Sequence, residues 1–363
     1  MELREPNLPT FDQIRQAPKV VLHDHLDGGL RPVTILELAD EIGYNDLPAD
    51  DPESLSTWML RGANRKDLTL YLETFAHTVA VMQTADAIER VARECAEDLA
   101  ADGVVYAEIR FAPELHTSRG LSLDEVIEAV LAGFAAGSAD TALTIRVLCS
   151  AMRHLDQGLA VAQAAVRFRD QGVLGFDIAG PEDGFPPDDH LVAFQYCQRE
   201  NFPITIHAGE AYGPRSIWKA VQFCGANRLG HGIRIIEDFD REEDGTIALG
   251  RLSRFLRNHR IPLEVCPTSN VNTGVVDSIA DHPIDQLIKL RFRVTVNTDN
   301  RLMSGVSMTS ELATLVETFG YGWDTLQWLT VNAMKSGFLD FDKRLDMINN
   351  VIKPGYAQLA EAS

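Results

Sequence analysis

Short runs of apolar and β-branched residues recur along the chain and predict its strands. They lie at residues 19–23, 104–112, 143–150, 173–180, 203–210, 228–232, 261–267 and 292–299. The segments between these runs have the apolar spacing of amphipathic helices, and Ser122-Leu-Asp-Glu125 has the spacing of a helix capping box. Strands that alternate with helices pair in parallel, so the pattern predicts an α/β fold.

The number of these units favours a particular α/β architecture. The runs are apolar on both faces, as in a sheet covered on both sides, and eight strand–helix units favour a single (β/α)8 barrel of the TIM type. A doubly wound open sheet is the alternative. The segment at about 26–103, between strands 1 and 2, is too long for an ordinary crossover, and we expect extra helices there to cap the C-terminal face. No linker or repeat divides the chain, which predicts one domain over residues 1–363.

Charge narrows the possible partners. Lys and Arg number 33 against 53 Asp and Glu, a net charge of −20, which argues against binding to nucleic acid or to an anionic membrane. The five cysteines form no CxxC pair, and the N-terminus has no apolar signal-peptide core. We therefore expect a cytoplasmic protein that acts on a small molecule. No pattern in the sequence specifies an oligomeric state.

Polar side chains gather where the predicted strands end. His23 and His25 share one face of the first strand, whereas His207, His231 and Asp299 end the fifth, sixth and eighth strands. These ends meet at the active-site face of a barrel. Histidines at strand ends can also serve only as hydrogen-bonded structural groups. Three of these four imidazoles together with the carboxylate nevertheless suit Zn²⁺. A water in a remaining open position would have its pKa lowered toward about 7.

Five motifs, in this order, resemble those of the adenosine deaminases within the metal-dependent amidohydrolase superfamily. They are His23-Asp-His25-Leu-Asp27-Gly28, Asp177-Ile-Ala-Gly180, His207-Ala-Gly-Glu210, Leu229-Gly-His231-Gly and Asn297-Thr-Asp299. The resemblance implies a barrel with one Zn²⁺ per chain. It also implies hydrolytic deamination of adenosine and 2′-deoxyadenosine to inosine, 2′-deoxyinosine and ammonia in purine salvage. Tyr106-Ala-Glu108-Ile-Arg110 also resembles the family, and we expect it to play a supporting structural role.

The resemblance implies roles for individual residues. The implied metal ligands are His23, His25, His207 and Asp299. The implied catalytic residues are Glu210, His231 and Asp299. Glu210 would donate a proton to N1 of the purine, and burial would keep this carboxyl protonated. His231 would lie beside the attacking oxygen without binding the metal, and Asp299 would flank the same position.

Substrate recognition is implied by the same likeness. The implied substrate-binding residues are His25, Asp27, Gly180 and Asn300. Asp27 would accept a hydrogen bond from a ribose hydroxyl and repel a 5′-phosphate, while the Gly180 N–H would donate to purine N3. Many family members have a second Asp where this chain has Asn300, and the amide of Asn300 can donate the same hydrogen bond to purine N7.

Two other functions are compatible with the sequence. The first is deamination of adenine or of a 5′-modified adenosine such as aminofutalosine. The second is a barrel without catalysis that binds a nucleoside. Other features are assigned no chemistry: His282 has no partner at metal-ligand spacing, and the acidic run at 237–244 is predicted to be a solvated loop and helix start.

Overall fold

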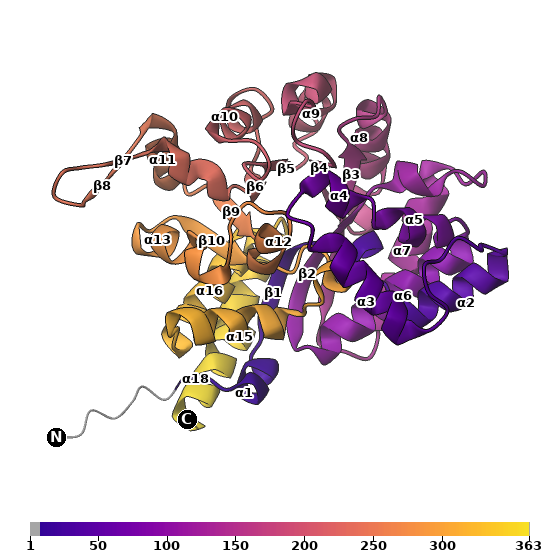
Figure 1. Cartoon of the computed structure of the whole chain (residues 1–363), viewed down its shortest axis with the longest axis horizontal. Helices are drawn as coiled ribbons and strands as arrows, with labels where there is room; N and C mark the ends of the chain where they lie inside the picture. Colours follow the sequence, from indigo (N-terminus) through magenta and orange to yellow (C-terminus); the bar gives the residue numbers. More distant parts are fainter. Residues whose placement is uncertain (1–7, 363) are drawn as a thin grey trace.

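A computed structural model describes residues 8–362, with parallel strands at the centre and helices around them (Figure 1). The central strands are β1 (Lys19–His25), β2 (Val104–Phe111), β3 (Thr144–Met152), β4 (Val173–Ala179), β5 (Thr205–Ala208), β6 (Arg228–His231), β9 (Pro262–Val265) and β10 (Arg293–Val296). Each overlaps one of the eight predicted runs. The predicted α/β class is therefore confirmed.

The eight strands follow one another around a ring. Two four-stranded parallel sheets have the orders β1-β2-β3-β4 and β10-β9-β6-β5. Single bridges join their edges, from Phe176 to Ile204 on one side and from Asp24 to Asp299 on the other. The backbone N–H of His25 also donates to the carbonyl of Asp299 at 2.7 Å. This order is that of the predicted TIM-type barrel.

Helices cover the outside of the ring. The longer ones are α7 (Leu123–Ser138), α8 (Gly158–Arg167), α9 (Leu191–Arg199), α10 (Pro214–Gln222), α11 (Arg251–Asn258), α15 (Met308–Phe319), α16 (Trp323–Ser336) and α18 (Lys353–Ala362). Shorter ones are α1 (Phe11–Gln16), α12 (Pro267–Asn272), α13 (Ile284–Lys289), α14 (Arg301–Ser304) and α17 (Phe341–Met347). Helix α7 begins at the predicted capping box, in which the Glu125 N–H donates to Ser122 Oγ at 3.2 Å.

The segment between β1 and β2 forms five α-helices. They are α2 (Pro32–Ile42), α3 (Pro52–Ala63), α4 (Leu68–Leu72), α5 (Phe75–Val81) and α6 (Ala85–Ala101). Residues of α4 and α5 line the cavity at the barrel mouth, whereas α6 packs beside α7 on the outside (Figure 1). Met59 is fully buried and Trp58 packs on His77, so neither lines the cavity. We propose that α4 and α5 are the part of the 26–103 segment that caps the active-site face.

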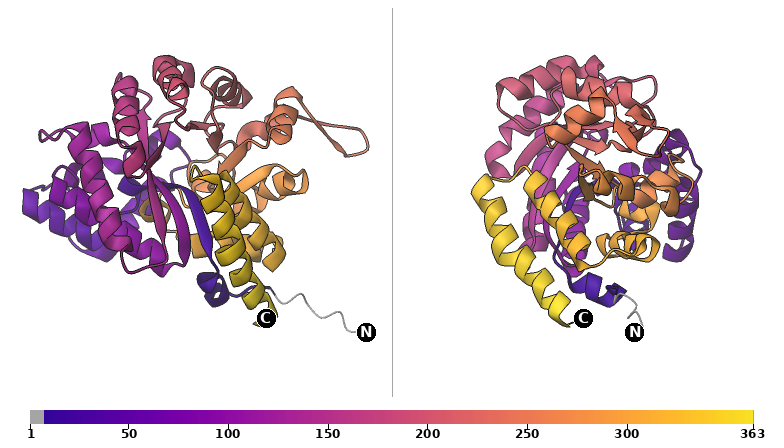
Figure 2. Two further views of the ribbon diagram at one scale, coloured as in Figure 1. Left: turned by 180° about the vertical axis from the view of Figure 1, so that it is seen from behind. Right: turned by 90° about the vertical axis from the view of Figure 1, so that its left-hand side faces the viewer.

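One prediction about local structure is wrong. The acidic run predicted as a loop and helix start instead belongs to an antiparallel hairpin of β7 (Phe239–Arg241) and β8 (Ile247–Leu249), which projects from the barrel (Figures 1 and 2). Phe239 packs near Phe292, with 5.9 Å between ring centroids. At the tip, Asp244 accepts hydrogen bonds from the N–H and the hydroxyl of Thr246. A single partly buried aromatic and a turn-forming Asp therefore outweigh the surrounding charge.

The buried apolar side chains form one cluster that includes both sheets and the surrounding helices. Helices α1 and α18, near the two ends of the chain, lie close together in both views of Figure 2, and Gly355 packs against Pro18. This continuity supports our proposal that residues 1–363 form one domain. Within residues 8–362, no helix has the length and apolar character that crossing a bilayer requires.

Candidate active site

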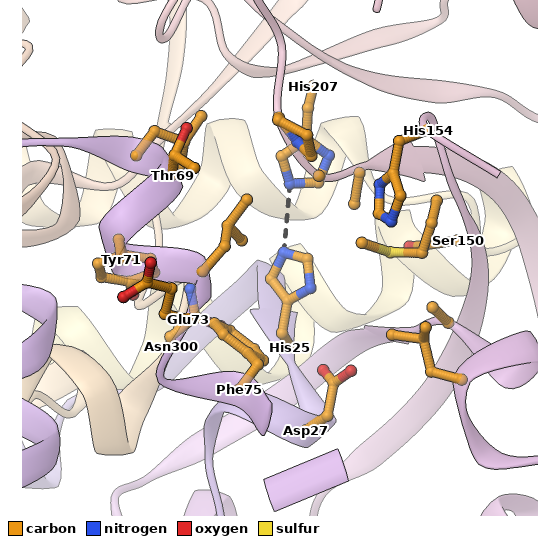
Figure 3. A pocket seen from close by; sticks show the side chains of 18 of the residues that line it. His25, Asp27, Thr69, Tyr71, Glu73, Phe75, Ser150, His154, His207 and Asn300 are labelled. Carbon is orange, nitrogen blue, oxygen red and sulfur yellow. Dashed lines mark hydrogen bonds between the residues drawn. The ribbon is translucent and has the colours of Figure 1, made fainter. Parts of the chain in front are cut away.

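A cavity of about 580 Å³ lies at the C-terminal ends of the strands (Figure 3). Its walls are largely apolar, and several of them come from α4 and α5, including Leu68, Tyr71 and Phe75. Its polar lining residues include His25, Asp27, Gly180, His207, Glu210, His231, Asp299 and Asn300. No Lys or Arg is among the lining residues in the described chain. The strand ends thus bring the predicted site residues to one cavity, and His23 lies buried beneath it.

The four predicted metal ligands meet at the cavity floor. His25 Nε2 lies 3.2 Å from His207 Nε2, the pair joined by a dashed line in Figure 3, and 3.4 Å from Asp299 Oδ1. His23 Nε2 lies 3.3 Å from the same Asp299 oxygen. Ligands bound at the usual distances to Zn²⁺ in tetrahedral geometry lie about 3.3 Å from one another. These three separations fit this arrangement.

The tautomers of two of these histidines also suit a cation. His23 Nδ1 lies 3.1 Å from Glu264 Oε2, and His207 Nδ1 lies 3.1 Å from Asp177 Oδ1 and 2.9 Å from the Ile178 carbonyl. These neighbours accept hydrogen bonds, so each Nδ1 carries the proton and each Nε2 has a free lone pair. The buried Nε2 of His23 has no hydrogen-bond partner in the described chain, which is the state a metal ligand requires.

His231 and Asp299 share an unusual backbone conformation. Their φ angles are +58° and +59°, in the left-handed region that residues other than glycine rarely adopt. His231 ends β6, Asp299 lies three residues beyond the end of β10, and both line the cavity. Strain of this kind persists only where the surrounding structure holds it, and it concentrates at functional sites. The Asp299 carboxylate is held by a 2.6 Å hydrogen bond from the Ser269 hydroxyl.

A chain of hydrogen bonds fixes the tautomer of His231. The backbone N–H of Ile284 donates to His282 Nδ1 at 3.1 Å, so neutral His282 carries its proton on Nε2, which donates to Asn270 Oδ1 at 3.2 Å. The Asn270 amide then donates to His231 Nδ1 at 3.1 Å. His231 consequently carries its proton on Nε2, which lies 3.4 Å from Glu210 Oε2. The sequence pattern indicated no function for His282 and therefore did not predict its link to His231.

Glu210 lies in surroundings that favour the protonated carboxyl. Burial is the main reason that its pKa is raised well above the usual range, and the carboxylates of Asp299 and Glu182 raise it further. Glu182, which the sequence motifs did not indicate, accepts hydrogen bonds from the N–H groups of Gly209, Glu210 and Tyr212 at 2.8, 3.0 and 2.8 Å. It therefore holds the loop that carries Glu210.

The other three predicted substrate contacts lie along the cavity wall. Asp27 is buried, its Oδ1 has no partner within residues 8–362, and burial is the main cause that raises its pKa to about 7. Gly180 has a φ of +99°, and a Cβ at this position would lie 3.1 Å from Met152 Cε. A larger residue at Gly180 would therefore be strained and crowded. Asn300 is buried, and its Oδ1 lacks a partner in the same part of the chain.

A buried ionic network supports the histidines from below. Arg110 donates to Glu264 Oε2 at 2.6 Å and to Asp177 Oδ2 at 3.3 Å, the two carboxylates that orient His23 and His207. The sequence assigned the Arg110 motif a structural role and gave Glu264 none. The available signal was a single charged residue inside an otherwise apolar strand, because such a charge needs a buried partner.

Fold and site together define a barrel hydrolase with a buried group, His23, His207, His231 and Asp299, that can hold a metal ion. His25 lies beside this group, 3.2 Å from His207. The sequence model of the family described as "Adenosine deaminase" matches residues 18–354. The chain therefore belongs to the adenosine deaminase family.

Individual relatives agree with this assignment. An adenosine deaminase of Mycolicibacterium vanbaalenii is 61% identical over 355 residues, which cover 96% of this chain and 98% of the relative. The solved adenine deaminase of Arthrobacter aurescens has a TM-score of 0.83 at 26% identity, covering 95% of this chain and 99% of that one. An amidohydrolase of Burkholderia ambifaria, crystallised with bound Zn, has a TM-score of 0.85 at 23% identity, covers 99% and 95% of the two chains, and shows the shared fold.

Proposed function

We propose that the protein deaminates adenosine and 2′-deoxyadenosine by hydrolysis, with one Zn²⁺ per chain, as a step of purine salvage. The observation that carries this proposal is the position of Glu210, a carboxyl whose pKa is raised, on the same cavity floor as four clustered metal-ligand side chains. The M. vanbaalenii adenosine deaminase, at 61% identity, supports the choice of substrate.

The residues present suit zinc. His23, His25, His207 and Asp299 would hold the ion through three imidazole nitrogens and one carboxylate oxygen, a donor set that Zn²⁺ favours. A bound ion of this kind supplies Lewis acidity that favours ionisation of water near neutral pH. Glu264 and Asp177 accept hydrogen bonds from Nδ1 of His23 and His207. They therefore keep these two imidazoles in the tautomer whose Nε2 has a free lone pair.

The protein side chains move the protons of the reaction. Glu210 donates its proton to purine N1, which removes the aromatic character of the ring as the oxygen of water adds to C6. Asp299 takes the proton that this water releases and passes it to the exocyclic nitrogen, while the Nε2–H of His231 donates a hydrogen bond to the same oxygen. Ammonia then leaves as the C6 carbonyl forms, and the proton of the C6 hydroxyl returns to Glu210. The products are inosine and ammonia, and every side chain regains its starting state.

The cavity walls favour a nucleoside over a nucleotide. Asp27 would accept a hydrogen bond from a ribose hydroxyl, the Gly180 N–H would donate to N3, and the Asn300 amide would donate to N7. Asp27 and Glu73 both line the cavity, and no Lys or Arg of the described chain does so. A 5′-phosphate would therefore meet carboxylates without a compensating cation. All five cysteines are buried and unpaired, and we propose a cytoplasmic location on this ground.

A substrate panel tests the proposed function. The metal-replete protein should be assayed with adenosine, 2′-deoxyadenosine, adenine, aminofutalosine and AMP, by the absorbance change of a 6-aminopurine that becomes a 6-oxopurine. Adenosine and 2′-deoxyadenosine should give the highest kcat/KM, with AMP lower by at least about 100-fold. A higher kcat/KM for adenine or aminofutalosine than for adenosine would identify that compound as the substrate instead. Nucleoside binding without turnover of any of the five would mean a barrel without catalysis.

A further inference from the structure

A second cavity, of about 740 Å³, lies at the opposite end of the barrel. Its walls come from the segments that enter β5, β6, β9 and β10 and from the C-terminal end of α16. The strands are parallel, so their N-terminal ends form this face and their C-terminal ends form the candidate active site. The two cavities therefore have separate linings.

The charge of the second cavity is opposite to that of the whole chain. Its charged lining residues are Arg228, Arg260, Arg293, Lys335 and Arg344, and none of its described lining residues is Asp or Glu. Arg228 is neutralised by Glu108 at 2.6 Å and by Glu264 at 2.5 Å. The other four cations have no carboxylate oxygen within 4.0 Å in residues 8–362. Four positive charges without a carboxylate partner thus line one cavity in a protein of net charge −20, although Arg260 and Arg344 each donate a hydrogen bond to a backbone carbonyl.

Part of this positive charge lacks hydrogen-bond partners. The Nε atoms of Arg293 and Arg344 are buried and unpartnered in the described chain. Burial is the main cause that lowers the pKa of Arg293, and the charges of Arg260 and Arg344 lower it further. The three guanidinium groups are therefore close enough to repel one another. A bound anion would relieve this repulsion and supply the missing acceptors.

We propose that this basal cavity binds a di- or triphosphate chain. Guanidinium groups match the paired oxygens of phosphate, and linked phosphates place several negative charges at the spacing of neighbouring side chains. A single carboxylate would neutralise only one of the four cations. The chemistry recognised is the phosphate chain itself, whether inorganic or attached to a nucleoside.

The backbone offers a matched pair of variants. Arg260 and Arg291 both adopt the left-handed conformation, with φ angles of +56° and +63°, in the loops that enter β9 and β10. Glycine adopts this conformation without strain, so replacing either arginine should keep the local backbone conformation, although Arg260→Gly also removes the hydrogen bond from Arg260 Nη1 to the Arg291 carbonyl. Only Arg260 lines the cavity. Arg260→Gly therefore removes a proposed ligand, and Arg291→Gly removes an equal charge outside the site.

Calorimetric titration of the full-length holoprotein with pyrophosphate, tripolyphosphate and ATP tests the proposal. At least one probe should bind once per chain, with an affinity that falls as salt is added. Equal affinity for tripolyphosphate and ATP would show that the cavity recognises the phosphate chain alone. Tighter binding of ATP would show that it recognises a nucleotide. Arg260→Gly and Arg293→Gln should each weaken binding by about tenfold or more, and Arg291→Gly by no more than about twofold.

Adenosine turnover provides the check on folding, because none of these three residues belongs to the candidate active site. The proposal is overturned if no probe binds at low salt, or if Arg260→Gly, Arg293→Gln and Arg291→Gly weaken binding equally. Binding of polyglutamate without binding of any phosphate probe would also overturn it, in favour of an acidic protein partner.

Discussion

Arg110 donates a 2.6 Å hydrogen bond from Nη2 to Oε2 of Glu264, and neither side chain is exposed to solvent. The other arm of the same guanidinium group reaches Asp177 at 3.3 Å. These carboxylates accept from Nδ1 of His23 and His207, two of the proposed metal ligands. One arginine therefore sets the spacing of two imidazoles that lie on different strands.

Loss of Arg110 should weaken metal binding, because Arg110 contacts the carboxylates that orient two proposed metal ligands and does not itself line the substrate cavity. In Arg110→Gln the two carboxylates lose their shared cation, so we expect zinc affinity to fall by about 10–100-fold and the free energy of unfolding to fall by about 3–5 kcal/mol. Chelator competition and urea unfolding measure these effects. Arg167→Gln, which breaks an exposed pair with Asp124, is the control and should cost less than about 1 kcal/mol. Unchanged zinc affinity in Arg110→Gln would refute the positioning role.

Replacement of Glu210 separates proton donation from metal binding. Glu210→Gln keeps the shape of the side chain and removes the acidic proton, so we expect normal zinc content and a kcat lower by about 10²–10⁴-fold. Metal analysis and steady-state kinetics on the same sample check both parts. Activity close to that of the unmodified protein would show that another group protonates the ring.

His282 should affect catalysis although it is remote from the substrate. In His282→Leu the Oδ1 of Asn270 loses its hydrogen-bond donor, so the Asn270 amide no longer fixes the proton of His231 on Nε2. We expect kcat to fall by about 10–100-fold with little change in KM. His282→Gln can still donate to Asn270 and should recover most of the activity. Equal losses in the two variants would mean that His282 serves packing alone.

Glu311 should make stability depend on pH. Burial is the main cause that raises its pKa from 4.5 to about 8. The folded protein therefore holds a proton that the unfolded chain releases, and the stabilising contribution is lost as the pH rises from about 4.5 to about 8. Glu311→Gln removes this titration, so its stability relative to the unmodified protein should rise across that window in urea unfolding. Glu317→Gln, on the exposed face of the same helix, is the control, and parallel curves for Glu311→Gln and the unmodified protein would contradict the assignment.

The strands were accessible from the sequence because each buried strand is a short apolar run between turn residues. The hairpin at Phe239 was not, because one partly buried aromatic among acidic residues gives no periodic signal. The cap was only partly predictable. The length of its segment indicated extra helices, but Trp58 and Met59 face other helices and not the cavity, a choice that depends on tertiary packing.

The candidate site likewise contains some residues that the sequence predicted and others that it did not. His207 and Asp299 were visible because a polar residue that ends an apolar strand marks the active face of a barrel. The Arg110–Glu264 pair was not, because its members are 154 positions apart in sequence and no local pattern links them. Glu182 also escaped detection, since it acts through backbone N–H groups that any sequence would supply.

The central claim is that His23, His25, His207 and Asp299 bind one divalent ion that the reaction requires. Zinc titration of chelator-stripped protein, with adenosine deamination recorded at each addition, tests it most directly. Activity should rise linearly and reach a plateau at one ion per chain, and His207→Ala should show neither tight binding nor recovery. Full activity in the stripped protein, or an unchanged titration in His207→Ala, would contradict the account.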